Sequence, residues 1–358
     1  MEEKMLKPAF YENNIPVAIT SSNEYAPFLG VLIESIIENS SKNNNYDIIV
    51  LSKEITEQNK LLLLEEIKDH KNFSLRFFEI GKYLEKYTFH TGYHITIMTY
   101  CRLALVDILQ MYDKAIYLDC DVIINDDIAD LYNHDLGNNM IGAAIDTVMA
   151  GLNNSASMNK QRKEQLDYNI NKLGIKDVFK YFNAGIIVLN LLEFRKKYTA
   201  ESLLSLAASE NWKWFDQDVL NKICYGRVTL IEQAWNFMCH RLDQEGDSTE
   251  KLAPKEIYEN YCYARLNPKA LHYCGRTTPC FAPLVDNAYY FWKYARNTPF
   301  YELIIYKMIV ESSTAISIWY SDNLFIRLIK KIVRKVFPFG SNRYAFMKKM
   351  YFKMLKKE

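Results

Sequence analysis

The stretch DKAIYLDCDVII (residues 113–124) sets two aspartates one residue apart at the end of an apolar run. Its first part has the aliphatic and aromatic content of a buried strand. On a continuing strand Asp119 and Asp121 would point the same way, so we expect the strand to end at Asp119, which lets both carboxylates reach one ion without facing the core. A solvated turn after a strand is the alternative interpretation, because a D-x-D pattern also arises by chance.

Short apolar and β-branched runs alternate with helical patterns around this stretch. The runs that indicate strands are PVAIT (16–20), DIIVL (47–51), FSLRFFEI (73–80), AIYLD (115–119), GAAID (142–146) and FNAGIIVLNL (182–191). Helices are indicated over residues 25–37, from a Thr56 cap to about Ile67, and over 96–109. This alternation predicts an α/β fold with a mainly parallel, doubly wound sheet, in which ligands bind beyond the carboxyl ends of the strands.

The composition is that of a large globular protein. The 358 residues are 49% hydrophobic and 14% aromatic, which is enough to bury a sizeable core. The seven cysteines are scattered and odd in number, so we expect no disulfide framework. The start MEEKMLKPAF lacks the apolar segment of a signal peptide, and no run of eighteen apolar residues follows. We therefore expect a cytoplasmic protein.

The net charge of +1 conceals a strongly basic C-terminal segment. Residues 324–358 hold 11 of the 44 Lys and Arg residues and one of the 43 Asp and Glu residues, so residues 1–323 carry nine more acids than bases. On a helix, LFIRLIKKIVRKVF (324–337) has a basic face opposite an aliphatic face. We predict peripheral attachment to the anionic inner face of the membrane, with a packed helix as the alternative. Nucleic acid is not expected, because the acidic body would repel it.

Five motifs resemble, in order and rough spacing, those of the retaining glycosyltransferases of family 8. They are YHITIMTYCRLAL (93–105), DKAIYLDCDVII (113–124), YFNAGIIVLNL (181–191), DQDVLN (216–221) and HYCG (272–275). This family includes glycogenin and bacterial lipopolysaccharide galactosyl- and glucosyltransferases. The resemblance implies a GT-A nucleotide-sugar fold, with a catalytic domain over residues 1–282 and an aromatic and basic helical region over 283–358.

The resemblance also implies a metal site formed by Asp119, Asp121 and His272. These residues would hold Mn²⁺, or Mg²⁺, against the diphosphate of a UDP-sugar. Two carboxylates and one neutral imidazole leave room for phosphate oxygens in an octahedral shell. Cys274 and Cys280 are expected to pack as small apolar side chains rather than to bind zinc, which would need a fourth ligand.

Four residues are expected to carry the chemistry on the donor sugar. By resemblance, Arg102 approaches the donor phosphate and sugar, and Asn183 contacts the sugar. Asp216 would bind the sugar hydroxyls, and Gln217 would lie beneath the anomeric carbon. The alternatives are an ion pair at the surface for Arg102, the start of a strand for Asn183, and helix capping for Asp216 or Asp218. Because a neutral amide is a poor nucleophile, we expect front-face displacement, in which the departing phosphate takes the acceptor's proton.

Further residues are expected around the donor and the acceptor. Cys120 would contact the nucleotide through its backbone, and Ala184 and Gly185 would keep the backbone close to the sugar. Asp146 would lie near the sugar or the acceptor, and His94 would line the acceptor side.

Two segments depart from the family pattern. The loop at 20–26 would hold uracil and ribose through Ser22, Asn23 and Tyr25, but its acid and amide are arranged differently from those of relatives. After HYCG, a lysine is usual three residues beyond the glycine, and here that position is Thr278. Gly275 and Arg276 are expected to contact the donor. Either Arg276 replaces the missing positive charge, or the site binds the diphosphate more weakly.

The leading hypothesis is a retaining, metal-dependent hexosyltransferase that uses UDP-glucose or UDP-galactose. Its acceptor would be a glycan or glycolipid, such as a lipopolysaccharide core or a capsule precursor. The alternative is a catalytically weak or inactive nucleotide-sugar-binding scaffold of the same fold, which the segment after HYCG favours. A nucleotidyltransferase is disfavoured, because the sequence lacks a Gly-rich, Lys-containing N-terminal loop.

Overall fold

The computed structural model describes residues 6–90, 92, 97–154, 159–240 and 249–321, except for the side chains of Arg276 and of residues 312–321. Contacts divide the chain into two compact units, residues 1–304 and 305–358. The domain boundary predicted at residue 282 stays a prediction, and the basic segment 324–358 lies outside the described residues. Among the residues that are described, no helix is both long and apolar enough to cross a membrane.

A mixed seven-stranded sheet forms the centre of the first unit, in the order β3-β2-β1-β4-β7-β6-β8. Its strands are β1 (Asn14–Ser22), β2 (Asn45–Lys53), β3 (Phe73–Glu79), β4 (Lys114–Asp119), β6 (Ile141–Ile145), β7 (Phe182–Asn190) and β8 (Val228–Leu230). The pairs are parallel except that β7 runs antiparallel to both β4 and β6. The predicted α/β fold with a mainly parallel sheet is confirmed, and the six predicted strands form β1 to β4, β6 and β7.

Much of the chain outside these strands is helical. The α-helices are α1 (Ala26–Asn39), α2 (Glu57–Ile67), α3 (Gly81–Leu84), α4 (Leu105–Ile108), α5 (Ile128–Tyr132), α6 (Thr147–Asn153), α7 (Lys160–Asp167), α8 (Leu191–Arg195), α9 (Ala200–Ala208), α10 (Phe215–Cys224), α11 (Lys255–Leu266), α12 (Ala288–Ala295) and α13 (Tyr301–Ser321). Shorter turns of 3-10 or π type are η1 (Asn23–Tyr25), η2 (Ile97–Ala104), η4 (Tyr168–Lys172), η5 (Val178–Lys180), η6 (Gln233–Asn236), η8 (Thr249–Leu252) and η9 (Gly275–Thr277).

Two helix predictions had different outcomes. Thr56 caps α2 as predicted, because its side chain accepts a hydrogen bond from the backbone N–H of Asn59. In its described part, the segment predicted as a helix over 96–109 is helical but not one continuous α-helix, because it forms the 3-10 helix η2 followed by the short helix α4. Most of η2 is buried, including the charged Arg102, so tertiary contacts override helical propensity there.

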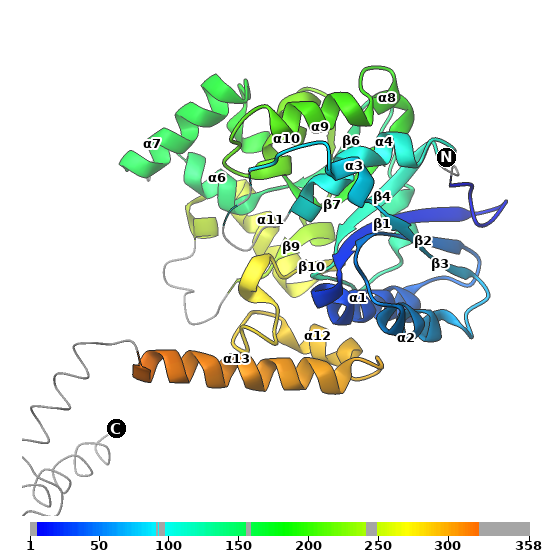
Figure 1. The fold of residues 1–358 in the computed structure, drawn as a ribbon. Helices are drawn as coiled ribbons and strands as arrows, with labels where there is room; N and C mark the ends of the chain where they lie inside the picture. Colours follow the sequence, from blue (N-terminus) through cyan, green and yellow to red (C-terminus); the bar gives the residue numbers. More distant parts are fainter. Residues whose placement is uncertain (1–5, 91, 93–96, 155–158, 241–248, 322–358) are drawn as a thin grey trace, which may run out of the picture. The chain divides into compact units, whose positions relative to one another are not determined.

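The strand order explains where a ligand site can form. β1, β2 and β3 advance in one direction across the sheet, so right-handed crossovers place α1 and α2 on one face. The chain then returns to the other side of β1 to form β4, and α4 lies on the opposite face (Figure 1). Thr20 of β1 pairs with Asp119 of β4 at this switch point. The connections leaving β1 and β4 separate here, which opens the crevice where α/β sheets bind ligands.

A second, three-stranded sheet completes this region. It consists of β5 (Val122–Ile124), β10 (Ala270–His272) and β9 (Phe237–Met238), with β10 in the middle. β10 runs antiparallel to β5 and places His272 opposite Val122. The backbone N–H of Tyr273 also donates to the carbonyl of Asp121, at 2.9 Å. Strand pairing thus brings a distant histidine beside the D-x-D segment.

Away from this region, α2 buries a carboxyl group against α1. The described residues offer the buried oxygens of Glu66 no hydrogen-bond partner. A Cβ added at Gly30 of α1 would lie only 2.7 Å from Glu66 Oε1, which shows how closely the two helices approach. Burial raises the pKa of Glu66 well above its ordinary value, and repulsion by Glu34 adds to the rise. The folded protein therefore binds this proton more tightly than the unfolded chain does.

We expect Glu66→Gln to stabilise the protein at neutral pH but not in acid. Stability associated with a raised carboxyl pKa is complete below the unfolded pKa and is lost as the pH rises through the folded pKa. A tenfold difference in proton affinity between the folded and unfolded states is worth about 1.4 kcal/mol, so the expected gain at pH 7 is on the order of 1 kcal/mol or more. The measurement is denaturant unfolding between about pH 4 and 8.

The matched control is Glu65→Gln, on the exposed neighbour that pairs with Lys68. Its effect should stay below about 1 kcal/mol at every pH. If Glu66→Gln changed the free energy of unfolding equally at both ends of the pH range, the raised pKa of Glu66 in the folded protein would be contradicted.

Candidate active site

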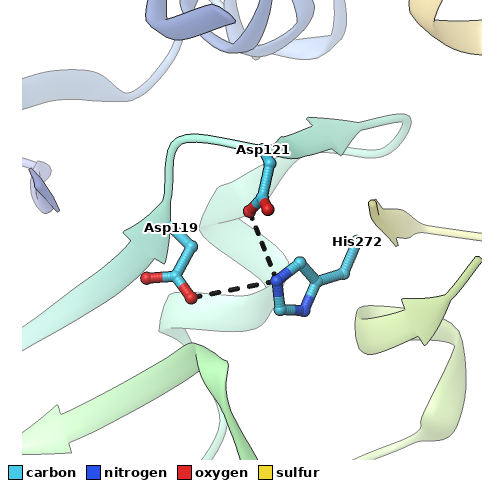
Figure 2. Close-up of side chains that lie close together, drawn as sticks. All are labelled: Asp119, Asp121 and His272. Carbon is cyan, nitrogen blue, oxygen red and sulfur yellow. Dashed lines mark ion pairs between the residues drawn. The ribbon is translucent and has the colours of Figure 1, made fainter. Parts of the chain in front are cut away.

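Three predicted metal ligands meet where the two sheets join. Asp119 ends β4, Asp121 directly precedes β5, and His272 ends β10. Figure 2 shows the two carboxylates turned toward the imidazole of His272. His272 Nε2 lies 3.3 Å from Asp121 Oδ1 and 3.8 Å from Asp119 Oδ2, and one ligand atom from each residue lies within 4.8 Å of the other two. The strand ends at Asp119 as predicted, and the three side chains converge.

The backbone of β7 makes room for His272. A Cβ added at Gly185 would lie 2.1 Å from His272 Cε1, a distance no real side chain tolerates. The other ring nitrogen, Nδ1, lies 3.2 Å from Asn236 Oδ1. The space at Gly185, which the sequence suggested was for the sugar, is thus used by the imidazole.

Burial and neighbouring charges shift the pKa values of the residues in the cluster. Burial raises the pKa of Asp119, and Asp121 adds to the rise although Arg102 opposes it. Burial alone would lower the pKa of His272, but Cys274 and Asp121 raise it overall. A divalent cation would reverse these effects by supplying positive charge between the carboxylates.

The neighbouring cysteines differ in their surroundings. Cys280 is buried, as the sequence suggested. Cys274 is half-buried and hydrogen-bonds to His272, so it is more than apolar packing.

Arg102 is buried in the site and not on the surface. Its Nη2 lies 2.7 Å from Asp119 Oδ1, and its Nε lies 2.8 Å from Asp216 Oδ2. Its Nη1 donates to the carbonyl of Ala184, and its guanidinium stacks over the Tyr117 ring at 4.2 Å. These contacts rule out the alternative of a surface ion pair. They make Arg102 the bridge between a predicted metal ligand and a predicted sugar ligand.

The two aspartates of the DQD segment have different surroundings. Asp216 accepts from the Thr99 hydroxyl and pairs with Arg102, so the capping interpretation is wrong for it. Asp218 instead accepts from the backbone N–H of Trp214 at 2.8 Å, and from two tyrosine hydroxyls. Burial raises the pKa of Asp216 to about 6, although Arg102 and Thr99 oppose the rise. Asp218 therefore holds the helix start, and Asp216 belongs to the site.

Gln217 forms hydrogen bonds with two other residues of the predicted donor site, Asp146 and Ala184. Its Nε2 donates to Asp146 Oδ2 at 3.1 Å, and its Oε1 accepts from the backbone N–H of Ala184 at 2.9 Å. Asp146 also caps α6, where Oδ1 accepts from the N–H of Met149 at 2.8 Å. Asn183 Oδ1 accepts from the N–H of Gly185 at 3.0 Å. The structure thus brings Asp146, Asn183 and Gln217 into one hydrogen-bonded group.

The predicted nucleotide loop begins in the last residues of β1 and continues into η1, at the switch point. Asn23 Oδ1 accepts from the N–H of Thr56 at 2.9 Å and from Asn59 Nδ2 at 2.8 Å, so it fixes the start of α2. Tyr25 packs edge-on against the Phe28 ring. Ser22 ends β1, and Cys120 is half-buried between the two aspartates. The positions agree with a base-binding loop, whereas the contacts with a nucleotide stay predictions.

The segment after β10 contains the departure from the family pattern. Gly275 has a φ of +67°, a left-handed conformation that favours glycine. Thr278, at the usual lysine position, is buried and neutral. The Arg276 side chain and the whole of His94 lie outside the described residues, so their predicted roles stay predictions.

Sequence reasoning missed three supporting residues. The Tyr117 hydroxyl donates to Asp119 Oδ1 at 2.9 Å, and the two-residue period of β4 contained that signal. Thr99, which contacts Asp216, and Asn236, which contacts His272, carry no local signal. They come from η2 and η6 and reach the site only through the tertiary fold.

Solved structures resemble this fold. The bifunctional glycosyltransferase WbbM superimposes with a TM-score of 0.74 at 31% identity, over 85% of this chain and 53% of WbbM. The galactosyltransferase LgtC, solved in complex with donor and acceptor sugar analogues, superimposes with a TM-score of 0.62 at 23% identity, over 80% of this chain and 96% of LgtC.

Sequence relatives agree. The lipopolysaccharide 1,2-glucosyltransferase of Escherichia coli is 27% identical over 183 residues, which is 50% of this chain and 48% of that enzyme. This chain also spans only 62% of a Haemophilus influenzae relative that is 30% identical to it over 225 residues. The family model for glycosyl transferase family 8 matches residues 16–279. The chain therefore belongs to glycosyltransferase family 8.

Proposed function

We propose that this glycosyltransferase moves glucose or galactose from a UDP-sugar to a glycan or glycolipid acceptor, with retention of configuration and with a divalent cation. The observation that carries the proposal is the convergence of Asp119, Asp121 and His272 at the switch point of the sheet. Sugar-binding candidates surround this cluster, since Arg102 links Asp119 to Asp216.

The three side chains fit Mn²⁺ or Mg²⁺. Carboxylate oxygens are the ligands that these hard ions prefer, and a single imidazole is compatible with Mn²⁺. Asp119 offers Oδ2, because its Oδ1 is held by Arg102 and Tyr117. When bound, the cation would offset the charge of the diphosphate leaving group.

We propose retention without a covalent intermediate, because the described carboxylates beside the candidate sugar site are already engaged by other groups. Asp216 is paired with Arg102, and both oxygens of Asp146 are hydrogen-bonded. Gln217 is a neutral amide whose two ends are both engaged. Front-face displacement needs none of them as a nucleophile: the departing phosphate takes the acceptor's proton while Asp216 and Gln217 orient the sugar.

The names of relatives support the substrate class. LgtC is a galactosyltransferase, and the Escherichia coli relative is a lipopolysaccharide glucosyltransferase. By analogy with these two enzymes, we propose that the donor carries a hexose. The proposed acceptor is a lipopolysaccharide core or another membrane-linked glycan.

A binding scaffold without turnover is the second candidate. The observation that favours it is Thr278, a buried neutral residue at the usual lysine position. In that case the protein would bind UDP and its sugar conjugates but release no UDP from them.

Turnover is measured as UDP release from UDP-glucose and UDP-galactose, with water as the acceptor. Release should require Mn²⁺ or Mg²⁺ and should fall by about 100-fold or more in Asp121→Ala, because several kcal/mol of charge stabilisation are lost. Asp69→Ala, at an exposed position outside the site, is the matched control. Metal-independent release, or full activity of Asp121→Ala, would refute the mechanism, and UDP binding without release would favour the scaffold.

Gly185→Ala should weaken metal binding while leaving the sheet folded. The new methyl group would occupy the position of His272 Cε1 and displace the ring. Titration of the folded variant with MnCl₂ should show an affinity at least about 10-fold weaker than that of the wild type. Gly142→Ala in β6 is the control, since its methyl group would meet the end of the Leu136 side chain away from the site. Equal Mn²⁺ affinity of wild type and Gly185→Ala would show that His272 does not bind the ion.

We further propose that residues 324–358 attach the protein to the anionic inner face of the membrane. Eleven basic side chains among aromatic residues should favour anionic over neutral lipid. Sedimentation with liposomes should show binding to anionic vesicles that weakens with salt and is lost when residues 324–358 are deleted. Unchanged binding after the deletion would place the contact elsewhere in the chain.

A further inference from the structure

A chain of buried amide side chains ends at His272. Asn183 on β7 contacts Asn236 on η6, which in turn contacts the imidazole. Asn236 is fully buried, and Asn183 and His272 are almost so. Buried polar groups need partners of the correct kind, so the hydrogen bonds in this chain must run in one consistent direction.

The direction is fixed at the end farthest from His272. The backbone N–H of Gly185 can only donate, and it lies 3.0 Å from Asn183 Oδ1. That atom must therefore be the amide oxygen. Asn236 lies 3.0 Å from the same oxygen and must present its Nδ2 there as a donor. Flipping the Asn236 amide would bring two oxygen atoms together in a buried site.

The same logic sets the state of His272. With its Nδ2 turned toward Asn183, Asn236 presents Oδ1 to the imidazole, 3.2 Å from Nδ1. An oxygen at this position requires Nδ1 to carry a proton. In the neutral ring the lone pair is then on Nε2, which is the nitrogen that faces Asp121 and Asp119. Only a nitrogen with a free lone pair can bind a metal ion.

We infer that Asn236 is a positioning residue that holds His272 in the tautomer and orientation needed for metal binding through Nε2. The inference rests on the proposed metal site. It adds to that site the residue that holds the histidine ligand in its metal-binding tautomer and orientation. Histidine ligands usually donate their second N–H to an acceptor that fixes the ring. Here the acceptor is a neutral amide, whose own orientation is set by the backbone of β7 through Asn183.

The hydrogen bonds from Asn183 through Asn236 to His272 also connect the metal site to the predicted sugar site. Asn183 hydrogen-bonds to Asp146, which in turn accepts from Gln217. A displacement of Asn183 would therefore move Asn236 and, through it, the imidazole of His272. The candidate sugar contacts and the candidate metal ligand are parts of one hydrogen-bonded network.

The test compares two replacements of Asn236 in the full-length protein. Asn236→Leu removes both hydrogen bonds at similar volume, whereas Asn236→Asp keeps an oxygen acceptor for Nδ1 but loses the donor to Asn183 and places its second oxygen against Asn183 Oδ1. Binding of MnCl₂ is followed through the EPR signal of the free ion, which requires neither substrate nor turnover. We expect Asn236→Leu to bind Mn²⁺ about 10- to 100-fold more weakly than the wild type, and Asn236→Asp to recover much of the loss.

Two controls separate positioning from folding and from the metal proposal itself. Asn169→Leu removes another fully buried amide, one that bonds to Asn153 and Gln165, and should lower the melting temperature without changing Mn²⁺ affinity. His272→Ala should weaken Mn²⁺ binding at least as much as Asn236→Leu does. If Asn236→Leu does not fold, Asn236→Ala replaces it, because alanine also removes both hydrogen bonds of the Asn236 side chain.

The outcomes distinguish the positioning role from the metal site itself. If His272→Ala weakens binding but the folded Asn236→Leu variant binds as the wild type does, the positioning role is wrong and the metal site stands. The positioning role is also overturned if Asn236→Asp unfolds at the same temperature as the wild type and yet binds Mn²⁺ no better than Asn236→Leu. If His272→Ala leaves Mn²⁺ binding unchanged, the metal site fails and the inference fails with it.

Discussion

One buried guanidinium, that of Arg102, holds the candidate site together. It pairs with Asp119 at the end of β4 and with Asp216 at the start of α10, two elements that are distant in sequence. A buried charge is costly unless it is paired, and removing one partner leaves the other uncompensated. Arg102 therefore offsets part of the free-energy cost of burying each carboxylate. The pKa of each is still raised with Arg102 present, chiefly because burial disfavours the charged form of a carboxyl group.

The contacts of Arg102 also determine what Asp119 can offer. One oxygen, Oδ1, is held by Arg102 and by the Tyr117 hydroxyl. The other, Oδ2, faces His272 across 3.8 Å. A carboxylate held in this way can present one oxygen to an ion without rotating. The arginine thus does more than balance charge, because it sets the direction in which the aspartate points.

The sequence predicted the strands better than the site's supporting contacts. The runs that became β1, β2 and β4 are short and strongly apolar, and their burial follows directly from composition. The segment predicted as one helix over 96–109 forms the 3-10 helix η2 and the short helix α4 in its described part, and most of η2 is buried, including Arg102. Asn236 and the fit of His272 against Gly185 depend on strand pairing between distant segments. No local pattern encodes such contacts.

The spacing of the two aspartates has a structural cause in the junction of the two sheets. Asp119 is the last residue of β4 in the large sheet, and Val122, directly after Asp121, is the first residue of β5 in the small sheet. The chain thus crosses from one sheet to the other within two residues, Cys120 and Asp121. The pairing of β10 with β5 then fixes His272 relative to Asp121, while β4 fixes Asp119. An insertion at Cys120 would leave both sheets able to form but would separate the carboxylates, so the short crossing itself creates the ligand geometry.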